Sequence, residues 1–162
     1  MQKKFILNLL ITFSFIALSF AYFVEFVLGH EPCNLCKIER IPYIGSIILI
    51  SFFIFTNKWE KIILSIILLL FIFGSVTSIY HVGIEQGIIS ESLLCELGLN
   101  TNIQNSDDLL KSLKKTPISC KDVTFRIFGL SLATFNAFLS IVISYILLKL
   151  IIKKWIKLTK KL

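Results

Sequence analysis

Long apolar runs separated by short polar segments dominate the pattern of the chain. Four such runs stand out, at residues 5–28, 38–56, 62–82 and 125–150. A helix of about 20 apolar residues crosses a hydrocarbon core of ~30 Å, whereas an open strand would leave backbone polar groups unpaired in lipid. The second run reaches this length only by including the turn that begins at about residue 38. The pattern therefore predicts an all-α membrane protein, a four-transmembrane-helix bundle that forms a single domain over residues 1–162 in the lipid bilayer.

Polar and charged residues gather in two longer connections, at about residues 29–41 and 83–124, whereas residues 57–61 form a tight turn. The short flanks that are richer in Lys and Arg face the cytoplasm. With the N-terminus inside, the inner segments carry ten Lys and Arg residues and the outer segments carry seven. We therefore expect both termini in the cytoplasm and the two longer connections as outward-facing loops.

Composition supports a membrane protein. Hydrophobic residues make up 56% of the chain and charged residues 17%, against about 45–50% and about 25% in an ordinary soluble domain. The mean hydropathy is +0.83, which excludes a disordered chain. The net charge is +7, and six of the 17 basic residues fall within the last 14 positions. That pattern is typical of an interfacial helix on anionic lipid or of a solvated basic tail, so we expect no nucleic-acid partner.

All four cysteines lie in the predicted outer loops: Cys33 and Cys36 in the first, Cys95 and Cys120 in the second. Disulfides persist on the oxidising side of a membrane. Four cysteines allow three pairings, and the sequence favours Cys33–Cys36, which closes a small ring, and Cys95–Cys120, which closes a long loop. A four-cysteine zinc site is an alternative. Because such sites usually contain two close pairs and the second pair here is widely spaced, we expect no metal.

The first cysteine pair has the features of a reactive site more than of a structural staple. A ring as small as Cys33–Cys36 restricts the unfolded chain little. Pro42 suits the first turn of a helix, which places Cys36 just before a helix N-terminus with Arg40 close by. Helix N-termini and cationic neighbours stabilise a thiolate, so we expect Cys36 to be reactive. The alternatives for Arg40 are a snorkelling interfacial arginine and a partner for Glu39.

Residues 32–40, Pro-Cys-Asn-Leu-Cys-Lys-Ile-Glu-Arg, resemble the Pro-Cys-x-x-Cys-x-x-x-Arg signature of the disulfide bond formation protein B (DsbB) family. The likeness extends to the four helices, to a cysteine pair in the long loop, to His81 at the exit of the third helix and to residues 126–131 at the start of the fourth. The chain departs in having Phe125 where many relatives carry Trp, and a polar Asn34 inside the motif. The resemblance covers nearly the whole chain.

The resemblance implies an enzyme, a quinone-dependent thiol–disulfide oxidoreductase of the bacterial inner membrane. Such a protein reoxidises a periplasmic DsbA-like thiol oxidase and passes the electrons to a membrane quinone, either ubiquinone or menaquinone. Carried over to this chain, the resemblance implies that Cys95 receives the partner's electrons through a mixed disulfide and that Cys120 is its pair. Cys33 then relays the electrons, and Cys36 faces the quinone.

The resemblance also implies a cofactor site formed by Cys36, Arg40 and His81. Arg40 then lies beside the quinone, and His81 matches a histidine that the family places near it. An interfacial hydrogen-bonding residue is the alternative for His81.

Two other functions remain open. One is a non-enzymatic four-helix membrane protein whose two disulfides brace its outer loops. The other is a channel or transporter subunit, for which Asn136 in the fourth helix is the main indication. A single Asn in such a helix more often makes an interhelical hydrogen bond. No predicted helix contains a buried charged pair, so transport is the weakest of the three hypotheses.

Overall fold

The computed structural model describes residues 2–56, 59–90, 95, 119–121, 125–127 and 129–159. In chain order the elements are α1 (Gln2–Phe26), α2 (Asn34–Ile38), α3 (Ile41–Thr56), α4 (Glu60–Glu85), β1 (Arg126–Ile127), β2 (Leu130–Ser131) and α7 (Leu132–Thr159). Four helical segments among these are long and apolar enough to cross a membrane: Ile6–Phe26, Asn34–Thr56, Glu60–Glu85 and Leu132–Lys153. The predicted four-transmembrane-helix, all-α fold is therefore confirmed.

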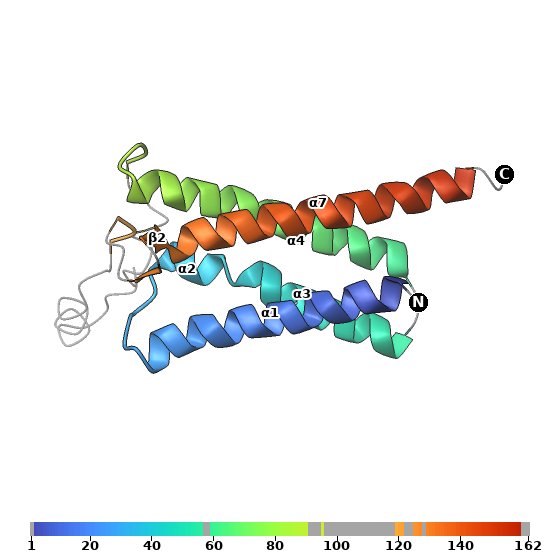
Figure 1. Ribbon diagram of the computed structural model, residues 1–162, viewed down its shortest axis with the longest axis horizontal. Helices are drawn as coiled ribbons and strands as arrows, with labels where there is room; N and C mark the ends of the chain where they lie inside the picture. The colour runs from blue at the N-terminus through green and yellow to red at the C-terminus, as the bar shows by residue number, and fades with distance from the viewer. Residues whose placement is uncertain are drawn as a thin grey trace, which may run out of the picture.

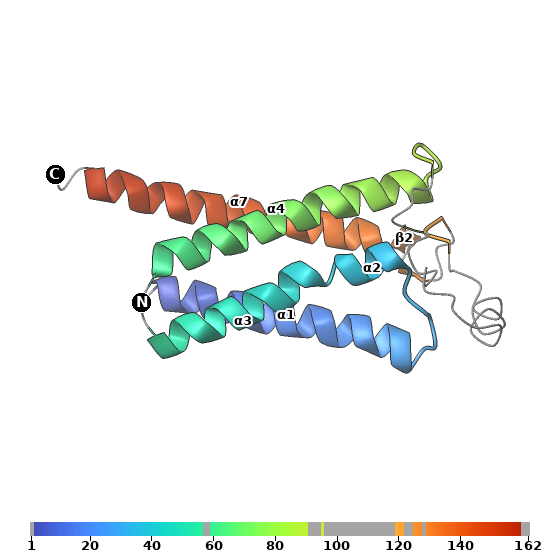
Figure 2. The ribbon, with the colours of Figure 1, turned by 180° about the vertical axis from the view of Figure 1, so that it is seen from behind.

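The helices form an elongated bundle in which α7 packs along α4, α4 packs against α3, and α3 packs against α1 (Figures 1 and 2). The start of α1 and the end of α7 lie at one end of the bundle. The short helix α2 and strand β2 lie at the opposite end, which we call the cysteine end. Chain connectivity therefore brings the two cysteine-bearing segments to the same end.

Apolar side chains line both the interior and the outer surface of the bundle. The central cluster consists of Leu7, Leu10, Tyr43, Ile50, Ile63, Ile67, Phe71 and Leu147. Large apolar residues also point outward, Phe15 and Leu69 among them, and more than half of each is exposed. Such a surface suits lipid and not water. Small polar groups join the helices inside, where the Ser14 and Ser46 hydroxyls lie 3.0 Å apart between α1 and α3.

The second span is divided in two, which corrects its predicted start at residue 38. Ile38 is the last residue of α2, and α3 begins at Ile41. Pro42 lacks an N–H group, so it cannot donate the hydrogen bond that would continue α2 into α3. Cys36 therefore lies inside a helix. The sequence had indicated a position just before a helix, and that prediction is wrong.

The fourth span begins at Leu132 and not at residue 125, and its helix continues to Thr159 beyond the predicted end at residue 150. Residues 126–131 instead contain an antiparallel pair in which Arg126 lies opposite Ser131. Gly129, with φ +83°, adopts a left-handed conformation that suits the connecting turn. The Ser131 hydroxyl then accepts a hydrogen bond from the Thr134 N–H, which caps the start of α7.

The third span, α4, is longer than predicted at both ends and includes residues 83–85 of the expected second loop. His81 consequently lies within the last turns of a helix. Most of that loop, residues 91–94, 96–118 and 122–124, lies outside the described residues.

Candidate functional site

The first cysteine pair is held by the first turn of α2. Cys33 is the N-cap of this helix, and its sulfur accepts a hydrogen bond from the Cys36 N–H at 3.3 Å. Their three-residue spacing places both side chains on one face of the turn. The two sulfurs lie 2.9 Å apart, and both residues are free thiols. The helix N-terminus thus acts on Cys33, whereas the sequence had assigned that position to Cys36.

The surroundings of Cys33 favour its thiolate form. A hydrogen bond from the Cys36 side chain is the main reason that its pKa falls from an ordinary 9.0 to about 4. Burial opposes this change, and a hydrogen bond and the charge of His81 add to it. The lowered pKa favours the thiolate form of Cys33, which is the reactive form of a cysteine.

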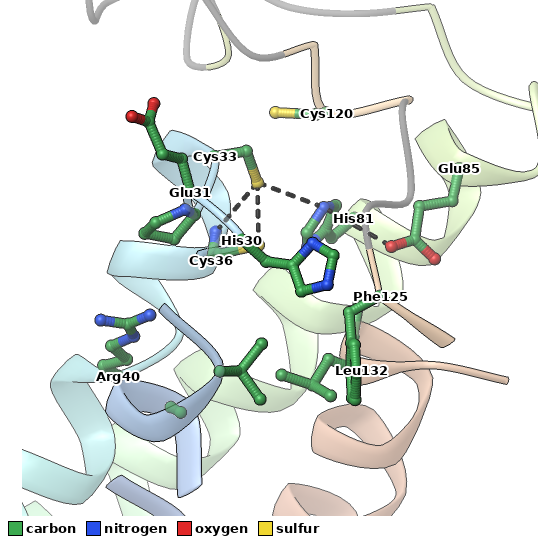
Figure 3. A pocket seen from close by; sticks show the side chains of 14 residues that line it. His30, Glu31, Cys33, Cys36, Arg40, His81, Glu85, Cys120, Phe125 and Leu132 are labelled. Atoms are coloured by element: carbon green, nitrogen blue, oxygen red, sulfur yellow. Dashed lines mark hydrogen bonds and ion pairs between the residues drawn. The ribbon is translucent and has the colours of Figure 1, made fainter. Parts of the chain in front are cut away.

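His81 reaches Cys33 from the neighbouring helix α4. Its Nε2 atom lies 3.5 Å from the Cys33 sulfur, and its Nδ1 atom lies 2.8 Å from Oε1 of Glu39. Glu85, one turn further along α4, lies 3.8 Å from Nε2. The side chain of His81 is only 3% exposed, so these groups determine its environment. Figure 3 shows the Cys33 sulfur connected to both Cys36 and His81 at the wall of a pocket.

Glu39 is a buried carboxylate that the sequence analysis considered only as a partner for Arg40. It follows α2 directly and is 6% exposed. Its second oxygen accepts a hydrogen bond of 2.9 Å from the side-chain amide of Asn136 on α7. That amide also donates to the Ser78 hydroxyl, and its oxygen accepts from the Tyr43 hydroxyl. Asn136 therefore has the predicted role of an interhelical hydrogen-bonding residue.

Arg40 turns away from Glu39. Its guanidinium forms an ion pair with Glu25 of α1 and lies 4.8 Å from the centre of the Tyr22 ring. The alternative in which it pairs with Glu39 is therefore wrong. Arg40 also lines the pocket that Cys36 lines, so the pocket wall carries a fixed positive charge.

The second cysteine pair is a disulfide, Cys95–Cys120, which confirms that predicted pairing, whereas the predicted Cys33–Cys36 bond is not formed in the structure. Both residues are buried and belong to one cluster with Cys33, Leu35 and Ile84. The side-chain amide of Asn34 donates to the Cys95 carbonyl at 3.4 Å. The cysteine end thus brings the two pairs together across more than 60 residues of sequence.

The pocket at this site is formed by α1, α2, α4, α7 and the segments that precede α2 and β1. Its lining residues include Cys33, Cys36, Arg40, His81, Cys120 and Phe125 (Figure 3). All three residues predicted to contact a cofactor, Cys36, Arg40 and His81, therefore face one pocket. Of the four cysteines predicted to be catalytic, three line it, and Cys95 is bonded to one of those three.

Comparisons with known proteins agree with this arrangement. A family model described as "Disulfide bond formation protein DsbB" matches residues 3–150. The chain is also 34% identical over 141 residues to the uncharacterized protein RP370 of Rickettsia prowazekii (strain Madrid E), which covers 84% of this chain and 81% of that protein. No solved structure matches this chain. The membrane bundle, the paired cysteines and the family match together show that the chain belongs to the DsbB family of membrane disulfide bond formation proteins.

Proposed function

We propose that the protein is a quinone-dependent thiol–disulfide oxidoreductase that reoxidises a periplasmic DsbA-like thiol oxidase. The observation that carries this proposal is the meeting of two cysteine pairs in one buried cluster, one as a disulfide and the other as free thiols beside a pocket. Thiol–disulfide exchange requires a thiolate close to a disulfide, and both are present here.

The proposed route moves two electrons from one pair to the other. The partner's two thiols reduce the Cys95–Cys120 disulfide and become a disulfide themselves. The reduced outer pair then reduces a Cys33–Cys36 disulfide, which restores Cys95–Cys120 and leaves two thiols on α2. In the structure Cys95–Cys120 is a disulfide and Cys33 and Cys36 are free cysteines, the arrangement that follows this second exchange.

The lining of the pocket supports a quinone as the electron acceptor. A quinone head group has an apolar ring with two carbonyl oxygens, so it needs apolar walls and hydrogen-bond donors. Val24 and Phe125 supply apolar surface, and Arg40 supplies hydrogen-bond donors, with Cys36 beside it. A bound quinone accepts two electrons and two protons. In this proposal Arg40 would orient one of its oxygens, and the thiols of Cys33 and Cys36 would provide the electrons.

We place the cysteine end in the periplasm of a bacterial inner membrane and both termini in the cytoplasm. The helical path supports both termini on one side of the membrane, because α1 begins and α7 ends at the same end of the bundle, and the excess of Lys and Arg on that side favours the cytoplasm. The exposed positions Ser90 and Lys153 allow a test. In a Cys33→Ser/Cys36→Ser background, a membrane-impermeant thiol reagent should label Ser90→Cys in intact cells, and Lys153→Cys only after permeabilisation. The reverse pattern would contradict the orientation.

The function itself is tested with the full chain reconstituted into liposomes that contain ubiquinone or menaquinone. A reduced, soluble DsbA-type thiol oxidase is added, and its thiols and the quinone absorbance are followed together. We expect one quinone to be reduced for every two thiols lost. Cys36→Ser should insert normally but stop quinone reduction, whereas Ser75→Ala, a buried change on α4 whose hydroxyl bonds only its own helix, should not. Thiol oxidation without quinone consumption, or near wild-type rates for Cys36→Ser, would refute the proposal.

A further inference from the structure

A buried chain of hydrogen bonds crosses the bundle from the Cys33 sulfur to α7. It runs from Cys33 to His81, from His81 to Glu39 and from Glu39 to Asn136, at 3.5, 2.8 and 2.9 Å. Cys33 and Glu39 are the N-cap and C-cap residues of α2, His81 lies on α4 and Asn136 lies on α7. Each of the four residues therefore lies on a helix or caps one.

The chemistry of the donors and acceptors determines where the proton of His81 lies. An ionised carboxylate only accepts hydrogen bonds, so the contact with Glu39 requires the proton on Nδ1. With that proton in place, the Nε2 lone pair can accept the proton of a Cys33 thiol, and the protonated ring donates Nε2–H to a Cys33 thiolate. A carboxylate that accepts a hydrogen bond from one ring nitrogen, and so selects the tautomer of a histidine, is common in catalytic sites.

Glu39 itself is held from the opposite side. The Tyr43 hydroxyl donates to the oxygen of the Asn136 amide, which leaves the NH₂ group of that amide to face Glu39 and Ser78. Burying a carboxylate is costly unless it is paired, and the neighbouring Arg40 is engaged with another acid. Glu39 therefore depends on His81 for a compensating positive charge and on Asn136 for its position.

From this geometry, and resting on the proposed oxidoreductase function, we propose that Cys33, His81 and Glu39 form a proton-transfer triad. In it His81 exchanges a proton with the Cys33 sulfur, and Glu39 and Asn136 are positioning residues. This role of His81 differs from the one predicted from the sequence, in which His81 contacts the quinone.

The proposed step is an exchange that needs no external oxidant. Consider a mixed disulfide between Cys33 and one sulfur of the outer pair. The second outer thiolate attacks the outer sulfur, so the Cys95–Cys120 bond forms and the bond to Cys33 breaks. The electron pair leaves on the Cys33 sulfur. Protonated His81 stabilises this leaving thiolate through Nε2–H and returns the proton when a thiol is formed, and in the reverse direction Nε2 accepts it.

Other titratable groups near His81 belong to the same site. Those that face it or share its pocket wall are Glu39, Glu85, Cys33, Cys36, His30, Glu31 and Arg40. Of these, Glu39 is the group within hydrogen-bond distance of Nδ1, and Glu85 approaches Nε2 at 3.8 Å from the pocket side. A pH profile of Cys33 reactivity should therefore respond to Glu39 more strongly than to Glu85.

The test measures Cys33 alone and requires neither quinone nor partner. The detergent-solubilised full chain carries Cys95→Ala and Cys120→Ala, and iodoacetamide alkylation is mapped to Cys33 by peptide mass spectrometry across a pH series. We expect Glu39→Gln, which keeps the shape of the side chain, to move the midpoint upward by about one pH unit. That change is about a tenfold loss of thiolate below the midpoint.

A graded set of variants separates the triad from general damage. His81→Gln should shift the profile at least as far as Glu39→Gln, Glu39→Asp should recover part of the shift, and Asn136→Ala should shift it less. Ser75→Ala on α4 is the matched control and should leave it unchanged. Circular dichroism verifies that each variant keeps its helices.

Superimposed profiles for wild type, Glu39→Gln and His81→Gln would overturn the triad. The outcome is distinct from failure of the proposed function, because the reactivity of Cys33 is measured whether or not quinone is reduced.

Discussion

Replacing Arg40 with alanine tests how the pocket recognises its electron acceptor. The guanidinium lines the pocket with Cys36, and its ion pair with Glu25 holds it there. A charge-assisted hydrogen bond contributes ~1.5–3 kcal/mol, and about 1.4 kcal/mol corresponds to a factor of ten in affinity. Arg40→Ala should therefore weaken quinone binding by about tenfold to a hundredfold. Arg40→Lys should restore only part of this loss, because an ammonium supplies charge without the planar, two-pronged donor.

The structure adds a complication that the same experiment has to resolve. Arg40→Ala also leaves the Glu25 carboxylate, whose side chain is only 21% exposed, without its cationic partner. An unpaired, partly buried charge impairs folding or insertion irrespective of any quinone. The double variant Glu25→Gln/Arg40→Ala removes that charge together with its partner. A double-mutant cycle then separates the ion pair from the acceptor.

The assay is partner oxidation per inserted molecule across a quinone titration. We expect Arg40→Ala and the double variant to share a raised apparent KM for quinone, whereas Glu25→Gln, whose amide oxygen still accepts a hydrogen bond from Arg40, should raise it less. Activity of Arg40→Ala should recover more at saturating than at low quinone. Coincident titration curves for wild type and Arg40→Ala, or full recovery in the double variant, would show that Arg40 only neutralises Glu25.

Three further predictions follow from other parts of the structure. Cys120→Ala should trap a covalent complex between Cys95 and the thiol oxidase, because the resolving thiol is gone; non-reducing gels should show a reductant-sensitive adduct, and an adduct that survives loss of Cys95 would reverse the proposed electron order. The pKa of Cys33 is about 4 in the folded protein against an ordinary 9.0, so between these values the unfolded chain binds the extra proton. Cys33 therefore contributes stability to the reduced protein that grows with pH across this window and is lost as the pH falls toward 4; denaturant unfolding in detergent should show a difference in the free energy of unfolding between wild type and Cys33→Ser that shifts in favour of wild type as the pH rises, and a difference independent of pH would count against a native thiolate. Gly74→Ala should destabilise the bundle by about 1–3 kcal/mol, since the added methyl would lie 2.9 Å from the rigid ring of a buried proline on α3. Gly45→Ala meets only the flexible tip of a leucine at 2.8 Å and should cost less in thermal unfolding; equal costs would argue against close packing of α3 on α4.

The sequence by itself determined the number of spans and the character of the chain. Whether a helix crosses a bilayer depends on the summed hydropathy of about 20 consecutive residues, a local property that neighbouring segments hardly change. The pairing of Cys95 with Cys120 was also predictable from local spacing. Cys33 and Cys36 lie close together in the chain and were predicted as one pair, which leaves Cys95 and Cys120 as the other. The motif from Cys33 to Arg40 likewise lies in one continuous stretch, and it was enough to indicate the family.

Helix boundaries at the cysteine end were less predictable, since they depend on single backbone groups. The missing N–H of Pro42 interrupts the second span, and the left-handed conformation of Gly129 permits a turn where the apolar run continues. Hydropathy does not register either effect. As a result, the sequence assigned the helix N-terminus to Cys36, and the structure assigns it to Cys33.

Only the tertiary structure decided which polar groups meet inside the bundle. Glu39 and Asn136 are 97 residues apart, and Glu39 and His81 are 42 apart. Arg40 binds Glu25 although Glu39 is its neighbour in the chain. Such pairings depend on how each helix is rotated about its axis and which helix packs beside it. Helix rotation and helix neighbours are determined by the fit of many apolar side chains at once. The residues next to Glu39 or His81 in the sequence therefore do not indicate which polar groups they meet.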